Sequence, residues 1–255
     1  MIKRVVFITD CSDIAYSELR GNLLSMVRED IDFEIEPVIS VEPFSIINGN
    51  FALRLMSEAY PPGTIFSIIL NPFKKRPARI IGTTKEKQFI FLGANTGVFT
   101  WLFKDFGVKS LYELHDPGFM PFGGKYIHLP AIASVLNGCN LATLGKEFDP
   151  KKLHTLTIEP FKVVHIDNFG LMKLNATTED LLKLGSVTEG TELKVCIGTN
   201  SMNVTYTKRM MSLSTGKWAI YPGSSLNLVE LGKVRQNGAA QLNANIGDQV
   251  AIKIK

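Results

Sequence analysis

The sequence has 255 residues, of which 45% are hydrophobic and 20% charged, a composition typical of a soluble globular protein with one large or two smaller domains. The formal net charge of +4 is small and the charged residues are scattered, which argues against a nucleic-acid partner. The three cysteines are far apart and odd in number, which argues against a disulfide framework or a zinc site.

The beginning of the sequence has no pattern of export or membrane insertion. Residues 1–10 pass from two cations into a short apolar run that ends at an aspartate, without the long apolar stretch of a signal peptide. No run in the sequence approaches the roughly 18 apolar residues that a membrane span needs. We therefore expect a cytoplasmic protein that has no membrane partner.

The first half of the chain alternates between strand and helix patterns. Residues 5–9 form an apolar run that predicts a strand ending at Asp10, and residues 16–27 carry apolar side chains at helical spacing. Further strands are predicted at residues 33–39, 64–70, 79–82, 88–92 and 108–114, and further helices at residues 44–60, 98–106 and 127–137. Such alternation predicts an α/β domain whose sheet is mostly parallel and covered by helices.

The run at residues 65–70 contains the sequence's clearest transition from a buried strand to a polar loop. Asn71-Pro72 ends the strand, because proline lacks an N–H group and disfavours a continuing helix or ladder. Ligands of α/β sheets bind outside the carboxyl ends of the strands, so the loop after Leu70 is the first place to expect chemistry. The basic residues 74–76 that follow fit a solvated loop better than a phosphate clamp.

The second half of the chain has a different pattern, which begins near Asp149-Pro150. Short predicted strands follow at residues 161–167, 171–176, 192–197, 202–206, 218–221, 226–231 and 249–254. Glycine, asparagine and serine separate these strands, a pattern typical of a small β-barrel or sandwich. The sequence thus indicates an α/β domain at residues 1–150, a linker at residues 151–159 and a β domain at residues 160–255.

Several short motifs occur in an order that is shared with one known family. They are Ile8-Thr9-Asp10, Tyr60-Pro61-Pro62-Gly63-Thr64, Phe91-Leu92-Gly93-Ala94-Asn95-Thr96-Gly97, Ile166-Asp167-Asn168-Phe169-Gly170, Gly223-Ser224-Ser225 and Ile246-Gly247-Asp248-Gln249-Val250. They resemble, in turn, the TDFG, YFPxGTV, FVGPDNG, IDxFGN, GSSGxLEIA and LGDxV motifs of the S-adenosylmethionine hydrolases, or hydroxide adenosyltransferases. The bacterial fluorinase and chlorinase are relatives of these hydrolases, and the motifs span nearly the whole chain.

The resemblance implies a fold, an assembly and a reaction. The fold would be a Rossmann-like amino-terminal domain followed by a small carboxyl-terminal β-barrel, and the assembly a homotrimer. An adenosyl ligand would lie between the first domain of one subunit and the second domain of a neighbour. S-adenosylmethionine would be the substrate or ligand rather than a cofactor, and its cleavage by water at the 5′ carbon would give adenosine and methionine.

The catalytic positions of the family are altered in this sequence. Family hydrolases aim water with an Asp, an Arg and a His, and the matching positions are Asn71, either Ala78 or Arg79, and Gly123. Asparagine cannot accept a proton as a general base would, and glycine offers only its backbone. Two hypotheses follow: a divergent hydrolase in which Asn71 and Arg79 or Lys75 aim the water, and an inactive adenosyl-binding or structural paralogue.

The resemblance also implies four ligand-binding residues, each of which has a simpler structural alternative. Asp10 would accept hydrogen bonds from the ribose diol, or cap a turn or helix. Asp167 would hold a ligand amino group, or form a turn before a glycine. Ser224 and Ser225 would contact adenine, or form a hairpin turn, the alternative that we favour.

Two histidines are alternatives for the missing catalytic imidazole. His128 is near Gly123 but has apolar neighbours, which favours a packing role over a catalytic one. His115-Asp116 is a possible base and partner in the loop before Gly123, although adjacent residues rarely form the orienting hydrogen bond.

Overall fold

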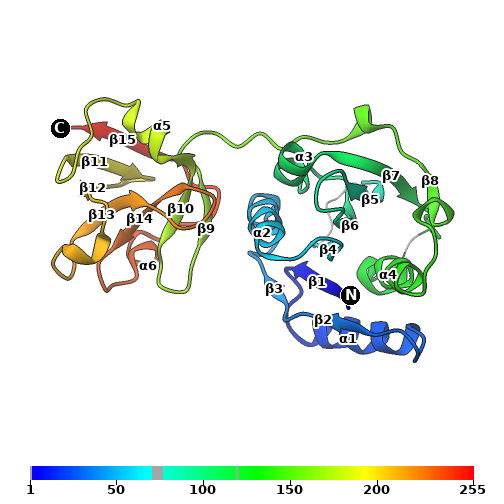
Figure 1. Cartoon of the computed structure of the whole chain (residues 1–255). Helices are drawn as coiled ribbons and strands as arrows, with labels where there is room; N and C mark the ends of the chain where they lie inside the picture. Colours follow the sequence, from blue (N-terminus) through cyan, green and yellow to red (C-terminus); the bar gives the residue numbers. More distant parts are fainter. Residues whose placement is uncertain (1, 71–76, 119) are drawn as a thin grey trace. The chain divides into compact units, whose positions relative to one another are not determined.

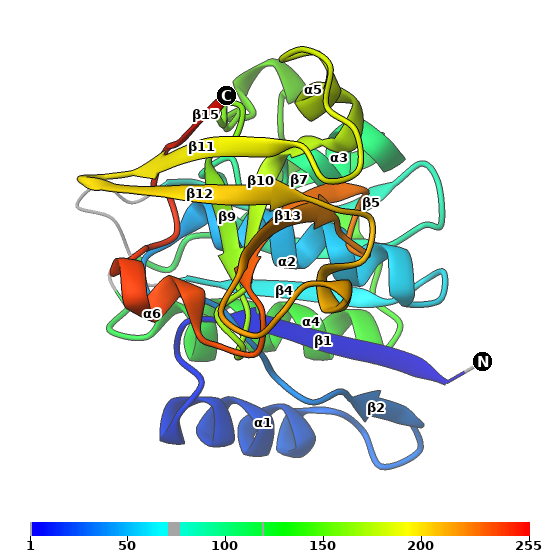
Figure 2. The same cartoon turned by 90° about the vertical axis from the view of Figure 1, so that its left-hand side faces the viewer.

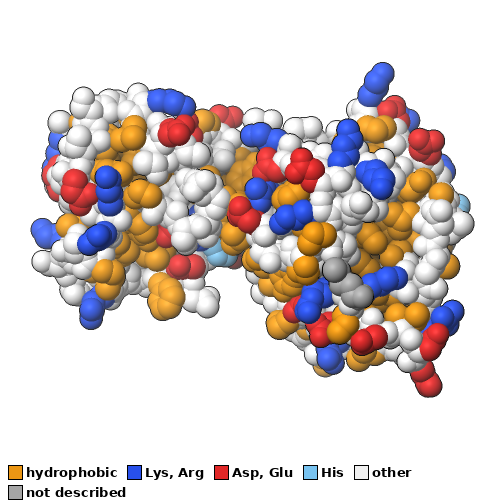
Figure 3. Space-filling view, in the orientation of Figure 1, with side chains coloured by type: hydrophobic (Ala, Val, Ile, Leu, Met, Phe, Trp, Pro, Cys, Tyr) orange, Lys and Arg blue, Asp and Glu red, His pale blue; other side chains and the backbone are white. Residues whose placement is uncertain are grey.

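The computed structural model describes residues 2–70, 77–118 and 120–255, and the chain divides into two compact units, Met1–Leu156 and Thr157–Lys255. Figure 1 shows helices and strands alternating in the first unit and strands dominating the second. Within the described residues, no helix combines the length and the apolar character that crossing a membrane requires. On the face drawn in Figure 3, cationic and acidic side chains are interspersed, in keeping with the small net charge.

The first unit is built on an eight-stranded sheet in the order β2-β1-β4-β6-β5-β7-β8, with β3 also paired to β1. The strands are β1 (Lys3–Thr9), β2 (Phe33–Ile35), β3 (Ile39–Ser40), β4 (Ile65–Ile69), β5 (Arg79–Thr84), β6 (Ile90–Ala94), β7 (Val108–Leu114) and β8 (Gly145–Glu147). The pairs from β2 to β6 are parallel, which confirms the mostly parallel α/β sheet that the alternating pattern predicts.

The other edge of this sheet is antiparallel. Strand β5 pairs with β6 and β7, and β7 pairs with β8, all in antiparallel register. Only residues 85–89 connect β5 to β6. This connection is too short for the crossover that a parallel pair needs, so the two strands form an antiparallel hairpin. One consequence is that the start of β5 lies at the same edge of the sheet as the ends of β1, β4 and β6.

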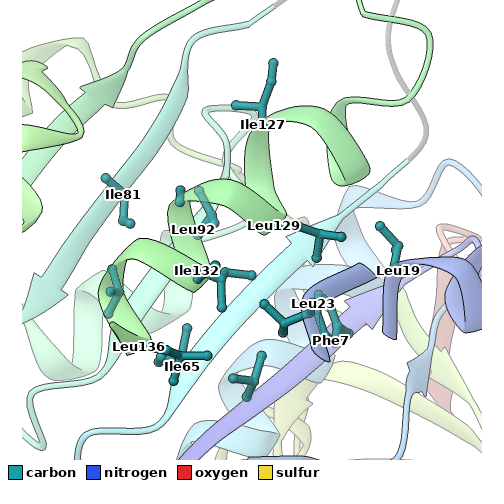
Figure 4. Close-up of a cluster of buried hydrophobic side chains, with 14 of the residues drawn as sticks. Phe7, Leu19, Leu23, Ile65, Ile81, Leu92, Ile127, Leu129, Ile132 and Leu136 are labelled. Atoms are coloured by element: carbon teal, nitrogen blue, oxygen red, sulfur yellow. The ribbon is translucent and has the colours of Figure 1, made fainter. Parts of the chain in front are cut away.

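Helices cover both faces of the first sheet and bury two separate hydrophobic clusters. Helices α1 (Ile14–Met26) and α4 (Leu129–Leu136) pack on the face that includes Phe7, Ile65 and Ile81. Figure 4 shows this cluster, with side chains of both helices meeting those of the strands. Helices α2 (Ile46–Ala59) and α3 (Thr100–Phe106) cover the opposite face. Each fully buried Leu, Ile or Phe contributes about 1.5–3 kcal/mol, so these clusters dominate the stability of the unit.

Two predicted elements of the first unit differ from the structure. The strand predicted at residues 33–39 is two short strands, β2 and β3, because Pro37 between them cannot donate to the ladder. The helix predicted at residues 127–137 begins earlier, with a π-helix, η1 (Gly124–His128), that leads directly into α4. Short π-helical turns are frequent at functional sites. The 3-10 helices η2 (Leu141–Thr143) and η3 (Pro150–Lys152) are further elements that the pattern does not predict.

The second unit is a seven-stranded sheet in the order β15-β11-β12-β13-β14-β10-β9. Its strands are β9 (Val163–Ile166), β10 (Met172–Thr177), β11 (Glu192–Ile197), β12 (Asn200–Tyr206), β13 (Trp218–Pro222), β14 (Leu228–Lys233) and β15 (Val250–Ile254). Figure 2 shows the long β11–β12 hairpin of this sheet. Two short helices, α5 (Thr178–Leu182) and α6 (Gly238–Leu242), and the 3-10 helix η4 (Met210–Ser212) complete the unit.

The second sheet curls until its two ends meet. The backbone N–H of Val163 donates to Asp248 (2.9 Å), and the N–H of Val250 donates to Phe161 (3.2 Å), so the chain at β9 hydrogen-bonds to the chain at β15. The enclosed core contains Val163, Leu174 and Val195 among its buried side chains. The sheet is therefore barrel-like, as the spacing of short strands predicts.

Candidate functional site

The carboxyl ends of three strands and the start of a fourth form one edge of the first sheet. In the pairing register, Thr9 lies beside Ile69, Ile68 beside Gly93, and Ala94 beside Arg79. This edge includes Leu70, after which the strand pattern predicts a ligand site. Residues 71–76, among them the predicted catalytic Asn71, lie outside the described residues, so its role stays a prediction.

Arg79 and Gly123 are brought together although they are far apart in the sequence. Arg79 begins β5, and Gly123 is the residue before η1. A Cβ atom built on Gly123 would lie 2.4 Å from Nη2 of Arg79 and 3.0 Å from its Cζ. The guanidinium therefore occupies the space that any side chain at position 123 would need.

Ala78 has a different environment from Arg79. Its side chain packs against the hydrophobic cluster on the α2 and α3 face, and its carbonyl accepts a hydrogen bond from the N–H of Asn95 (2.8 Å). Successive residues of a strand point to opposite faces of the sheet. Of the two candidates for the family's Arg position, it is thus Arg79 whose side chain reaches Gly123.

A second glycine allows η1 to approach β4 closely. A Cβ atom on Gly124 would lie 3.1 Å from Cδ1 of Ile69 and 3.1 Å from Cε2 of Phe122. Such contacts are tighter than most Cβ contacts, so a side chain here would require Ile69 or Phe122 to shift by a few tenths of an ångström. The absence of a side chain at Gly124 therefore suits the close packing of η1 against β4.

His128 ends η1 and is only 4% exposed. Its Nδ1 is 3.4 Å from Oγ of Ser67, a residue in the middle of β4. Burial, and secondarily the positive charge of Arg79, lower the pKa of His128 to about 3. The imidazole is therefore neutral near pH 7, and its burial agrees with the packing role predicted from its apolar neighbours. The sequence gives one signal for Ser67: a lone hydroxyl within an apolar strand.

Asp10 follows β1 at the same edge of the sheet. Its Oδ2 accepts a hydrogen bond from the N–H of Phe44 (2.9 Å), a residue in the loop before α2. Phe44 has a φ of 63° and is 62% exposed, an uncommon conformation for a bulky residue. Backbone of this kind is concentrated at functional sites. Asp10 thus anchors a loop, and its predicted contact with ribose stays a prediction.

Asp167 forms the turn between β9 and β10 in the second unit. Its Oδ1 accepts hydrogen bonds from the N–H groups of Phe169 (2.9 Å) and Leu171 (2.9 Å). Gly170 in this turn has a φ of 77°, and a Cβ atom there would lie 2.0 Å from Oδ1 of Asn237. Asp167 thus forms the turn, which is the structural alternative, and its contact with a ligand stays a prediction.

Ser224 and Ser225 lie in the turn between β13 and β14. The carbonyl of Ser225 accepts from the N–H of Leu228 (3.0 Å), and the two residues between them, Leu226 and Asn227, have φ values of 54° and 56°. Two consecutive positive φ angles define the type I′ turn of tight hairpins. The backbone at Ser224 and Ser225 therefore forms the hairpin turn, and a contact of these serines with adenine stays a prediction. The strand register places this turn and the Asp167 turn at opposite ends of the β10–β14 pair.

A row of four polar side chains, which no motif of the sequence singles out, crosses the second sheet. His165, Lys173, Glu230 and Tyr221 are direct neighbours on β9, β10, β14 and β13. Lys173 forms an ion pair with Glu230, and the hydroxyl of Tyr221 donates to the other carboxylate oxygen (2.8 Å). Burial, followed by the bond to Glu230, raises the pKa of Tyr221. In the sequence, each of these four residues is a polar residue within a predicted strand. Their alignment in one row depends on how the strands pair, which the sequence pattern does not show.

Comparison with known proteins identifies the family of this chain. Residues 5–145, more than half of the 255, match the model of the SAM hydroxide adenosyltransferase N-terminal domain. The chain belongs to this family. No curated protein matches the chain.

Two solved structures share the fold of this family member. An uncharacterized conserved protein from Thermotoga maritima has 22% identity and a TM-score of 0.83, over 97% of this chain and 99% of that one. A conserved hypothetical protein from Thermus thermophilus has 17% identity and a TM-score of 0.75, over 100% of both chains. At these identities the likeness concerns the fold alone.

One cavity of this adenosyltransferase-family domain lies beside η1 and α4. It has a volume of about 310 Å³, and its lining includes His115, Asp116, Tyr126 and Ser134. Among the described residues that line it, neither Asp10 nor Arg79 is present. The cavity therefore takes in the His115-Asp116 pair but is separate from the Arg79–Gly123 contact. In residues 2–70, 77–118 and 120–255, no three His, Cys, Asp or Glu side chains are grouped so as to hold a metal ion.

Proposed function

We propose that the chain binds an adenosyl ligand at the carboxyl edge of the first sheet, as a divergent member of the SAM hydroxide adenosyltransferase family. The observation that carries the proposal is the family match over residues 5–145, which includes the strands and the helix that form this edge. Asp10 would accept hydrogen bonds from the ribose diol, because a carboxylate can accept from two hydroxyls at once. Asp167, Ser224 and Ser225 of the second unit are the further ligand contacts that the resemblance implies.

Binding is tested by titrating the purified chain with adenosine in a calorimeter. We expect saturable heat for the wild type. Binding to Asp10→Ala should be at least tenfold weaker, because this variant loses at least one charge-assisted hydrogen bond to the ribose. Asp30→Ala is a matched control, since Asp30 is exposed and pairs with Arg28. The absence of heat from the folded wild type would contradict the proposal.

Cleavage of S-adenosylmethionine to adenosine and methionine is a second candidate, favoured by the family match. In this reaction the oxygen of water bonds to the 5′ carbon, the bond from this carbon to sulfur breaks, and its electron pair returns to sulfur. A water proton passes to solvent. The sulfonium is a good leaving group, so a site that orients the water and holds the ribose could suffice without a general base. Arg79, beside Gly123, supplies a cation at this edge of the sheet, but its guanidinium cannot act as a general base.

Turnover is tested by incubating the chain with S-adenosylmethionine and separating the products by chromatography. Adenosine in excess of a no-protein control, at a rate reduced by Arg79→Met, supports the enzyme. Heat of adenosine binding without adenosine formation supports instead a binding protein that has lost turnover.

We also propose the homotrimer that the resemblance implies. Sedimentation equilibrium would measure the mass directly, and a monomer or dimer at all concentrations would contradict it.

A further inference from the structure

The cavity beside α4 is built entirely from residues of the first unit. Leu114 ends β7, and the backbone N–H of His115 donates to the carbonyl of Leu144 (3.2 Å), which joins the loop after β7 to the segment before β8. Ala131 and Ser134 of α4 also line the cavity and share one face of the helix. Their small side chains leave room for a volume of about 310 Å³, which is enough for a small molecule.

Two hydroxyl groups in the lining have already used their protons. Oγ of Ser134 donates to the carbonyl of Pro130 (2.8 Å), and Oγ1 of Thr143 donates to the carbonyl of Asn140 (2.7 Å). A hydroxyl has a single proton, so each oxygen offers a ligand only its acceptor lone pairs. These groups therefore suit a ligand that donates hydrogen bonds rather than one that accepts them.

The charge of the lining is negative. Asp116 supplies a carboxylate, and none of the described residues that line the cavity is Lys or Arg. Oδ1 of Asp116 accepts a hydrogen bond from the N–H of Gly118 (2.9 Å), which forms a turn. A carboxylate has about four acceptor positions, so it can also accept from a ligand while it holds this turn. A cleft lined by charge of one sign concentrates ligands of the opposite sign, in this case cations.

The ring of Tyr126 adds an aromatic surface that already attracts a cation. Tyr126 is 46% exposed and lines the cavity. Nζ of Lys125 lies 5.3 Å from the centroid of this ring, within the range of a cation–π interaction. Lys125 also forms an ion pair with Glu18 (2.6 Å), so its charge is compensated. The ring thus favours the same sign of ligand charge as Asp116.

We propose that this cavity is a binding site for a small organic cation, a primary amine that carries an apolar group. An ammonium group has three N–H donors and no acceptor, which matches the carboxylate of Asp116 and the lone pairs of Ser134 and Thr143. The apolar group would pack on Leu114 and Leu144. A carboxylate or phosphate of the same size would face acceptors and a like charge, and the cavity would reject it.

The test compares three compounds of nearly equal size and different charge: benzylamine, benzyl alcohol and benzoate. Chemical-shift titration of the full-length ¹⁵N-labelled chain at pH 7.5 measures each Kd. We expect benzylamine to bind about fivefold tighter than benzyl alcohol or more, because its hydrogen bonds are charge-assisted, and benzoate to bind most weakly. Equal affinities for the three compounds, or tighter binding of benzoate, would overturn the inference.

Variants assign the binding to this cavity. Asp116→Asn keeps an oxygen that can accept from Gly118, and it should bind benzylamine no tighter than benzyl alcohol. Ser134→Phe should bind neither compound, because its ring fills the cavity. Asp30→Asn is the matched control, since Asp30 is exposed and pairs with Arg28, and it should keep the wild-type order. Unchanged binding of benzylamine by folded Asp116→Asn would place the amine elsewhere on the chain. If Ser134→Phe does not fold, Asp116→Asn decides.

The cavity and the proposed adenosyl edge can be tested separately, because neither Asp10 nor Arg79 is among the described residues that line the cavity. An excess of adenosine should leave the Kd of benzylamine unchanged. Displacement of benzylamine by adenosine would overturn the assignment of a separate site. Failure of the chain to bind adenosine would contradict only the proposed function, since the titration with the amine does not depend on it.

Discussion

At the scale of single residues, His128 illustrates how burial changes the chemistry of a side chain. Its pKa falls from 6.5 to about 3 on folding, chiefly because the buried environment disfavours the charged form. Between these values the unfolded chain binds more protons than the folded chain. The free energy of unfolding therefore decreases as the pH falls from 6.5 toward 3, by at most about 1.4 kcal/mol per pH unit from this group.

This prediction is checked by urea unfolding of the wild type and His128→Gln at pH 7, 5.5 and 4.5. We expect the variant to lose less stability than the wild type as the pH falls, because the other titrating groups are common to both proteins. Parallel curves for the wild type and His128→Gln would show that His128 does not take up a proton on unfolding.

Gly170 and Gly190 allow backbone strain to be separated from steric overlap. Both have positive φ angles, 77° and 85°, but only at Gly170 does a Cβ atom meet other atoms, 2.0 Å from Oδ1 of Asn237. We expect Gly190→Ala to reduce stability by about 1 kcal/mol and Gly170→Ala by about 2–4 kcal/mol. Denaturant unfolding measures both values. Equal losses would mean that Asn237 moves aside without cost.

At the scale of secondary-structure elements, the buried ion pair of Lys173 and Glu230 joins β10 to β14. Their side chains are 10% and 7% exposed. Removal of one partner leaves an uncompensated buried charge, which typically costs about 3–5 kcal/mol, whereas removal of both is often nearly neutral. We expect Glu230→Leu to be strongly destabilising and Lys173→Met/Glu230→Leu to recover most of the loss.

The measurement is a double-mutant cycle by denaturant unfolding. It is best made in a Tyr221→Phe background, because the hydroxyl of Tyr221 also donates to Glu230 and would lose its acceptor. If the double variant is as unstable as Glu230→Leu, the loss comes from packing of the glutamate rather than from the unpaired lysine.

At the scale of the whole molecule, each of the two units has its own hydrophobic core. The first unit has two clusters, one on each face of its sheet, and the second has the cluster inside its curled sheet. Contacts within one core are not shared with the other, so a local defect should affect the unit that contains it.

We therefore expect Gly170→Ala to increase hydrogen exchange in β9 and β10 of the second unit while the exchange of β1 and β4 stays unchanged. Hydrogen exchange with mass-spectrometric detection resolves these segments. A matching increase in β1 and β4 would show that the two units unfold as one cooperative body.

Much of the architecture was predictable from the sequence because it depends on local patterns. Alternation of strand and helix indicated the α/β unit. Strand β7 has the bounds predicted for it, residues 108–114, a short segment of mixed apolar and polar residues that begins after Gly107 and ends before a polar loop. The antiparallel β5 was not predicted. Strand direction within a sheet depends on which strands pair, and pairing is decided by packing across the whole unit.

The candidate site, too, was predictable from the sequence only in part. Motifs in order along the chain were enough to indicate the family, and direct reading of positions 71 and 123 showed that the Asp and His of the family hydrolases are missing. The folded chain was needed to show that Arg79, rather than Ala78, fills the space beside Gly123, and that His128 is buried and neutral near it. The physical reason is that steric contact and desolvation arise between residues distant in the chain, and neither is encoded in the spacing of the residues involved.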